Sequence, residues 1–136
     1  MDCVGELRAR LLPLLRQWER QLSAEHPEVD VTVWDRPVGS LTQWQGHDIG
    51  LNCLLPNAAP DQPDNVALSV GLNHLNGTPM LCSADVVWGH PSGTVESDVL
   101  PGPVPFSADA LDDVLTHLPE LLAALQDALR RGRPQR

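Results

Sequence analysis

The chain contains no lysine and no tyrosine, and it has only one phenylalanine. Without lysine it can form neither a Walker-type phosphate-binding loop, nor a Schiff base, nor a serine–lysine catalytic pair. Without tyrosine it has no phenolic acid or base. No apolar run approaches the roughly 20 residues needed to cross a bilayer, and the N-terminus lacks the basic-then-apolar pattern of a signal peptide. We therefore expect a cytoplasmic protein that does not associate with membranes.

Positive charge is scarce in this sequence. Its arginines number nine against 18 acidic residues, so the formal net charge is −9 and the isoelectric point is about 4.7. Nucleic-acid binding depends on clustered cations, and we expect no nucleic-acid partner. The length of 136 residues and the hydrophobic content of 42% fit one domain, 1–136. Its last residues, 132–136, are expected to form a frayed tail.

The three cysteines, Cys3, Cys53 and Cys82, form no CxxC pair. Cys53 and Cys82 lie within apolar, strand-like segments, where a free cysteine usually behaves as a small apolar residue. We expect both in the core, with no redox or metal-binding role. The sequence indicates no cofactor.

Two segments show the apolar spacing of amphipathic helices. The first spans about residues 2–26, and Pro13 is expected either to kink this helix or to mark its true start. The second spans about residues 107–131. Ser107 is a suitable N-cap, and Gly132 stands where a helix commonly ends.

Residues 28–100, between the helices, are predicted to form four or five strands separated by turns. Alternation of apolar and polar side chains predicts an inward set of Val29, Val31, Val33, Ile49, Leu51, Cys53, Leu55, Val66, Leu68, Val70 and Leu72. The expected fold is a two-layer α+β domain: an N-terminal helix, an antiparallel meander of four or five strands, and a C-terminal helix. Both helices are expected on one face of the sheet, which leaves the other face to solvent or to a partner.

The turn at residues 76–77 allows two strand registers. A two-residue turn would pair Leu68 with Asp85, whereas a three-residue loop pairs Leu68 with Val86. A slip of one residue inverts the faces of a strand. Because the second register keeps the core apolar, we expect the three-residue loop.

The next turn, His-Pro-Ser-Gly at 90–93, has the sequence of a type I turn. Pairing Trp88 with Gly93 across this turn places Asp85 directly opposite Glu96. Like charges that face each other on a sheet are unfavourable. A solvated face has no structural reason to carry two opposed acids, which indicates a role in binding. The alternative is a solvated acidic edge that improves solubility.

These outward positions predict a surface that binds a partner. Asp98 lies on the same face, and Asp30 extends the acidic patch if the sheet order brings it near. Trp34 also points outward and would supply an apolar anchor, unless residues 36–46 fold over it. The predicted partner-binding residues are Trp34, Asp85, Glu96, Asp98 and Asp30.

We therefore expect a small acidic binding or accessory protein rather than an enzyme. Its partner would be a protein with a basic surface, and a second copy of the chain is an alternative occupant of the open face. By architecture alone the chain is similar to small acidic immunity proteins and secretion chaperones, which present a sheet to a partner. That similarity implies a protein that masks a cationic effector.

The alternative function is a small hydrolase or a metal-dependent enzyme. In a meander, His47 and His74 lie at the same end of the sheet, together with Asp35 and Asp48, and such a group can bind a metal or relay a proton. His90 is expected at the opposite end and therefore outside this group. The spacing matches no metal signature such as HExxH.

Overall fold

The computed structural model describes residues 2–39, 45–56 and 58–132. The elements, in chain order, are α1 (Cys3–Glu25), β1 (Asp30–Gly39), β2 (Gln45–Leu54), β3 (Asn65–Leu75), β4 (Thr78–Trp88), β5 (Val95–Asp98), β6 (Val104–Pro105) and α2 (Ala108–Arg131). The strands form one antiparallel sheet in the order β1-β2-β3-β4-β5. The short strand β6 pairs with the beginning of β4.

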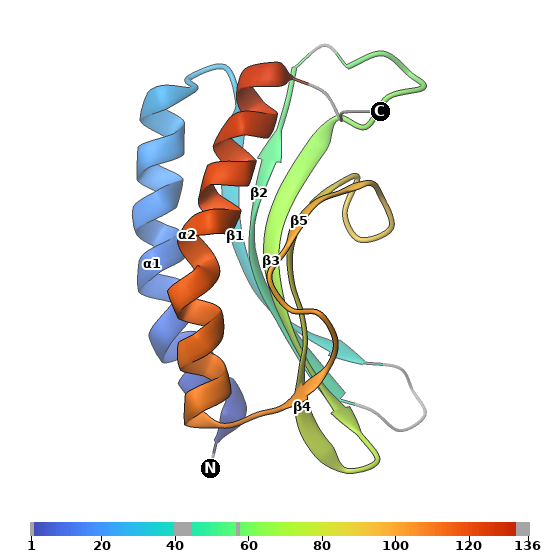
Figure 1. Cartoon of the computed structure of the whole chain (residues 1–136). Coiled ribbons are helices and arrows are strands. Elements are labelled where there is room, and N and C mark those ends of the chain that lie inside the picture. Colours follow the sequence, from blue (N-terminus) through green and yellow to red (C-terminus); the bar gives the residue numbers. More distant parts are fainter. Residues whose placement is uncertain (1, 40–44, 57, 133–136) are drawn as a thin grey trace.

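Both helices lie side by side on one face of the sheet (Figure 1). Helix α1 packs against β1 and β2, and α2 packs against β3, β4 and β5. The predicted α+β fold, with its antiparallel meander between two helices, is confirmed. The ends of the strands curve away from the helices, so that the uncovered face, called the open face below, is concave (Figure 1).

The ends of both helices follow the expected capping chemistry. The Asp2 carboxylate accepts a hydrogen bond from the Gly5 amide at 3.0 Å, and the Ser107 hydroxyl accepts one from the Ala110 amide at 3.0 Å. Gly132, at φ 75°, ends α2 in the left-handed region. Pro13 lies inside α1, so it does not mark the start of that helix. The predicted tail falls largely on residues 133–136, which lie outside the described residues.

The core lies between the helices and the sheet. Its fully buried side chains include, from the helices, Leu7, Leu11, Leu15, Leu22, Leu118, Leu121 and Leu125, and, from the strands, Ile49, Leu51, Cys53, Leu68, Leu81, Ala84 and Val86. The predicted inward alternation is therefore confirmed for the central strands. Neither described helix contains an apolar stretch of the length that crossing a membrane requires.

Strands β3 and β4 combine the two registers that the sequence allows. Next to the turn, Leu75 pairs with Thr78 around a two-residue turn, so the expected three-residue loop is wrong. Beyond an irregularity at Gly71/Leu72, Leu68 pairs with Val86, as predicted. The extra residue is accommodated inside the strand pair as a bulge rather than in the turn.

The residue that this bulge displaces is Cys82. Gly71 pairs with Ser83 and Leu72 pairs with Leu81, so that Cys82 is skipped. Its thiol is half-buried and contributes to the open face, and the predicted core position of Cys82 is wrong. Cys53 is completely buried in the core, as predicted.

The predicted register of β4 and β5 is also wrong. Asp85 pairs with Asp98, and the irregularity between Val86 and Val87 skips Glu96. The reason is a longer connection than the expected four-residue turn, since the Trp88 amide donates to the Thr94 carbonyl at 2.9 Å.

Glu96 consequently lies on the helix face of the sheet. One carboxylate oxygen accepts a hydrogen bond from the Trp88 indole N–H at 2.7 Å, and the other contacts the Arg131 guanidinium at 2.6 Å. Glu96 thus joins β5 to α2.

Candidate functional site

The open face of the two central strands carries unusually small side chains. Alternation places Gly46, Gly50, Ala67, Ser69 and Gly71 on this face of β2 and β3. Glycine is disfavoured inside strands and often marks a position that another group approaches closely. At Gly50 that group is the Trp34 ring, with which a Cβ would collide. The remaining small residues leave a hollow.

A pocket of about 290 Å³ occupies this hollow. Residues from β1 to β4 and from the loop after β4 line it: Val38, His47, Asp48, Ser69, Gly71, Leu72, Asn73, Cys82, Ser83, Asp85, Val87, His90 and Pro91. Its volume lies at the lower end of the range of about 300–1,000 Å³ for small-molecule sites. It is the size of one side chain or one small ligand.

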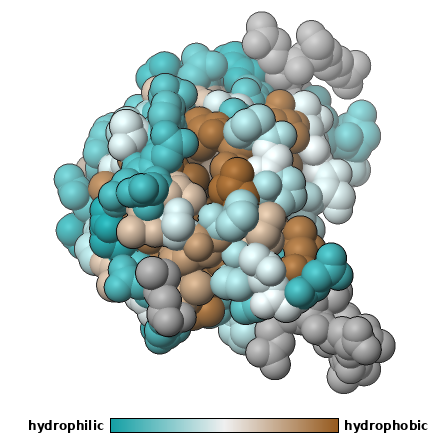
Figure 2. Space-filling model, turned by 60° about the horizontal axis from the view of Figure 1, so that its bottom comes forward, coloured by the Kyte–Doolittle hydropathy of each residue, from teal (hydrophilic) through white to brown (hydrophobic). Residues whose placement is uncertain are grey.

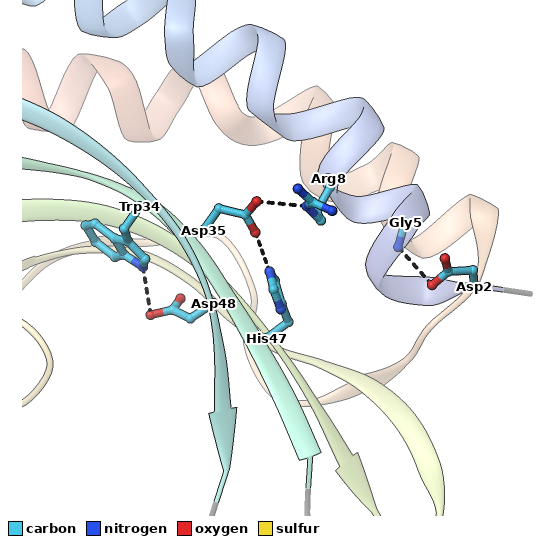
Figure 3. Close-up of polar contacts among 7 residues, drawn as sticks. All are labelled: Asp2, Gly5, Arg8, Trp34, Asp35, His47 and Asp48. Atoms are coloured by element: carbon cyan, nitrogen blue, oxygen red, sulfur yellow. Dashed lines mark hydrogen bonds and ion pairs between the residues drawn. The ribbon is translucent and has the colours of Figure 1, made fainter.

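Asp48 and Trp34 form one side of the site, where their side chains contact each other. The Trp34 indole N–H donates to Oδ2 of Asp48 at 3.1 Å. Figure 3 shows the two side chains turned toward each other from neighbouring strands. The Arg36 guanidinium carbon lies 5.5 Å from the centroid of the Trp34 ring, in a cation–π arrangement.

His90 covers this side from the loop that follows β4. Its ring lies 5.2 Å from the Trp34 ring, centroid to centroid, in an edge-on arrangement. Its Nε2 atom lies 3.9 Å from Oδ2 of Asp48 and 3.3 Å from the Ser69 hydroxyl oxygen. The expectation that His90 stands apart is therefore wrong. Gly89, at φ 64°, reverses the chain directly after β4 and returns His90 over the open face.

Asp85 forms the opposite side, on β4. The Ser69 hydroxyl donates to Oδ1 of Asp85 at 3.4 Å, and Ser69 itself is only 3% exposed. Asp98 pairs with Asp85 in the ladder, and its Oδ1 accepts a hydrogen bond from the Leu100 amide at 2.9 Å. The Ser69 hydroxyl therefore bonds to Asp85 and lies next to His90, which in turn lies next to Asp48.

Both carboxyl groups of the pocket are harder to ionise than usual. Burial raises the pKa of Asp48 above 3.8, against the opposing effects of the Trp34 hydrogen bond and the His90 charge. Burial and the adjacent Asp98 charge raise the pKa of Asp85. The protein thus compensates the negative charge of the pocket incompletely. A cation placed there would stabilise the ionised forms of Asp48 and Asp85.

The structure brings together only some of the five predicted partner-binding residues. Trp34 and Asp85 belong to the site, and Asp98 borders it. Asp30 is exposed at the start of edge strand β1, and the sheet order leaves β2 and β3 between it and Asp85. Glu96 lies on the other face of the sheet, so it cannot extend the acidic patch of the open face.

Residues 36–46 were the alternative cover for Trp34. Residues 36–39 instead continue β1, and residues 45–46 begin β2. Residues 40–44 lie outside the described residues. Within the described chain, the cover over Trp34 comes from His90 and Arg36.

The four residues of the alternative metal site do not come together. Asp35 and His47 hydrogen-bond to each other on the helix face, where the Arg8 guanidinium lies 2.8 Å from Asp35 (Figure 3). Asp48 lies on the open face, and His74 pairs with Pro79 near the end of the β3–β4 hairpin. No group of three or more His, Cys, Asp or Glu side chains in residues 2–39, 45–56 and 58–132 is placed to hold a metal ion. The predicted grouping is wrong because neighbouring residues on a strand face opposite sides.

Ser69, His90 and Asp48 are the residue types of a hydrolytic triad, but they lack its geometry. In a triad the carboxylate orients the histidine through one ring nitrogen while the other activates the serine. Here the serine oxygen and the carboxylate both approach Nε2 of His90. The arrangement provides hydrogen bonding and negative charge, which are means of binding.

Asp48 was assigned to another site, and Ser69 and His90 were not predicted as site residues. A signal for two of them exists in the alternation of the strands. Gly-x-Asp-x-Gly at 46–50 and Ser-x-Gly at 69–71 place polar or small residues at every second position. The position of His90 depends on the chain reversal at Gly89, for which strand alternation gives no signal.

Searches for similarity to protein families, to curated proteins and to solved structures found no match for this chain. What the site does is therefore inferred from its own geometry.

Proposed function

We propose that this chain is a protein-binding module that holds a basic protein partner on the open face of its sheet. The observation that carries the proposal is the position of its exposed apolar side chains. In the described part of the chain, the exposed large apolar residues are Val38, Leu54, Leu75 and Val95, with 38%, 42%, 43% and 57% of their surface accessible. Strand alternation assigns all four to the open face.

Val38 lines the acidic pocket, and the other three residues lie elsewhere on the same face. Val38 and Leu75 lie at the end of the sheet that carries the β3–β4 turn, and Figure 2 turns this end toward the reader. Leu54 and Val95 lie toward the other ends of their strands. Apolar groups that stay exposed on one face are typical of an interaction surface.

The charge of the open face specifies the kind of partner. Asp48 and Asp85 line the pocket and Asp98 borders it, whereas Arg36 is the cation on this face of β1. A basic protein surface would compensate these carboxylates while its apolar groups covered the margins. Such complementarity mainly speeds association and selects the partner.

The same charge disfavours a second copy as the occupant. Face-to-face pairing of two copies would bring two sets of these carboxylates together, and each chain carries a net charge of −9. The proposal also keeps the cytoplasmic location expected from the sequence. Cys53 and Cys82 form no disulfide, as is usual in a reducing compartment.

The test is a selection of ligands from a random peptide library displayed on phage, with the full chain as bait. We expect the selected peptides to be enriched in lysine or arginine. We expect them to bind more weakly to a Leu54→Ser/Val95→Ser variant, which removes apolar surface from the open face without changing the charge. The matched control is Ala9→Ser/Ala123→Ser, which alters exposed positions on the two helices.

Peptides without basic enrichment would overturn the proposal. Equal binding to the open-face variant and the helix control would also overturn it. So would a stable dimer, found by analytical ultracentrifugation, that dissociates when Leu54 and Val95 are replaced, because a second copy would then occupy the face.

A further inference from the structure

We infer that the pocket on the open face is an anchor site for a single basic side chain, lysine or arginine, of the partner protein. This inference rests on the proposed function and adds which part of the partner enters the molecule and where it is held.

The pocket has the two chemical regions that such a side chain requires. Val38, Val87 and Pro91 contribute apolar lining, which suits an aliphatic stem of methylene groups. Asp48 and Asp85 contribute carboxylates from two different strands. Lysine and arginine carry their charge at the end of an aliphatic stem, so both regions are used at once.

The carboxylates have oxygen atoms left for an incoming cation. Trp34 donates to Oδ2 of Asp48, and Ser69 donates to Oδ1 of Asp85. Among the described residues, no hydrogen bond to the other oxygen of either group is found. Every described buried side-chain oxygen or nitrogen atom has a hydrogen-bond partner, so these two unpartnered oxygens are not fully buried.

No guanidinium from residues 2–39, 45–56 or 58–132 pairs with these two carboxylates, although other acids have such a partner. Arg8 pairs with Asp35 at 2.8 Å, and Arg10 pairs with Asp112 at 2.9 Å. Arg36 is the cross-strand partner of Asp48, yet its guanidinium lies over the Trp34 ring. Within the described chain, the basic side chain within 4 Å of either pocket carboxylate is the imidazole of His90, 3.9 Å from Asp48.

Half-buried carboxylates without a fixed cation are costly to keep ionised, because burial removes water that would solvate them. A basic side chain from a partner supplies the missing charge and forms charge-assisted hydrogen bonds. Small divalent ions are the other common cations, but the described residues provide no group of three metal-binding side chains here. A cation on an apolar stem fits the pocket better.

The test is a titration of the full chain with three blocked pentapeptides that differ only at the central residue: lysine, arginine or norleucine. Norleucine keeps the stem and lacks the charge. Binding is followed by the NMR signals of the Ser69 and Ser83 amides and the Trp34 indole N–H. We expect saturable shifts with the lysine or the arginine peptide, and the stronger of the two identifies the preferred head group.

Asp48→Asn and Asp85→Asn remove one charge each with little change in shape. We expect each to weaken binding of the preferred peptide by about tenfold, the usual effect of losing a hydrogen bond to a charged group. Asp30→Asn is the matched control, since it removes the same charge at the exposed start of β1. We expect the affinity of that control to match the wild type.

Three results would overturn the anchor site: no saturable shift with either basic peptide, equal shifts with norleucine, or equal losses in Asp30→Asn and Asp85→Asn. None of them tests the docking face itself. If phage-selected basic peptides still depend on Leu54 and Val95, the docking function stands without the anchor. If that dependence is also lost, both proposals fail.

Discussion

The two faces of the sheet are built by the same strands but differ in the size and polarity of their side chains. Along β3, Leu68 and Val70 point to the helices, whereas Ser69 and Gly71 point to the open face. The helix face is filled with branched apolar side chains, which account for the fold. The open face replaces them with glycine and serine, and there the sheet forms a pocket. Alternation therefore allows one strand to pack against the helices on one side and to line a pocket on the other.

The acids on β4 and β5 show the same contrast. Glu96, on the helix face, bonds to the Trp88 indole and to Arg131. Asp85, on the open face, has an uncharged serine and a like-charged Asp98 as neighbours. An acid whose charge the protein compensates contributes to structure, and one whose charge it leaves uncompensated is available to a partner.

The largest expected effect breaks the packing of the helix face. Leu68→Ala should lower the free energy of unfolding by about 2–5 kcal/mol, because Leu68 is completely buried. Leu54→Ala makes the same change on the open face and should alter stability by about 0.5 kcal/mol or less. Urea denaturation of both variants measures the difference. Equal losses would show that the two faces are packed alike.

The next effect concerns Glu96. Glu96→Ala should lower the free energy of unfolding by about 1–3 kcal/mol, because it leaves the buried Trp88 indole N–H without its acceptor. Glu96→Gln keeps an acceptor and should lose less. Peptide affinity should stay at the wild-type value in Glu96→Gln, since this side chain faces the helices. If Glu96→Gln lost most of its peptide affinity at normal stability, Glu96 would belong to the binding surface after all.

Thiol labelling sharpens the comparison without altering the packing. Burial raises the pKa of the Cys53 thiol to about 12 and also raises the pKa of Cys82, which lines the pocket. We expect Cys82 to react with a thiol reagent in the native protein at least about tenfold faster than Cys53, because the reactive thiolate at Cys53 needs an opening of the core. Peptide mapping after timed labelling gives both rates. Similar rates would place both thiols in one environment.

The smallest expected effect is a gain in stability. The raised pKa of Asp85 means that its ionised form is less stable in the folded chain than in the unfolded chain. Asp85→Asn should therefore increase the free energy of unfolding at neutral pH by about 0.2–1 kcal/mol, the scale of a cross-strand pair. The gain should vanish as the pH falls below the ordinary value of 3.8, where the wild-type carboxyl is protonated in both states.

Denaturation of the wild type and Asp85→Asn at the two pH values checks this expectation. Asp30→Asn serves as the control for a general change in net charge. If the gain in the free energy of unfolding persisted unchanged at low pH, its cause would be packing rather than charge.

The sequence predicts the inward face of the sheet well, because burial selects large apolar residues at every second position. It predicts the register poorly, because the bulge at Gly71/Leu72 and the irregularity at Val86/Val87 each add one residue inside a strand pair. Each addition changes which residues face each other without disturbing the apolar pattern. Cys82 and Glu96, the two residues that these irregularities skip, are accordingly misplaced by alternation.

The candidate site was predicted in part. Trp34 and Asp85 follow from alternation, since each occupies an outward position on its strand. The sequence groups Asp48 with Asp35 and His47 in a metal site, because residues that are neighbours in sequence can face opposite sides of a strand. His90 depends on a long-range return of the loop after β4, which local pattern does not encode.

The glycines of the open face also allow the size of the pocket, and with it the proposed binding, to be graded by engineering. A Cβ at residue 71 would lie 2.6 Å from the Ser83 hydroxyl, which is the end of a flexible side chain and can rotate aside. Alanine or serine at 71 would then fill the pocket in steps of one or two heavy atoms, while the helix-facing core keeps its composition. Such a series can separate ligands by the length of their stem and the width of their head group, on an otherwise unchanged domain.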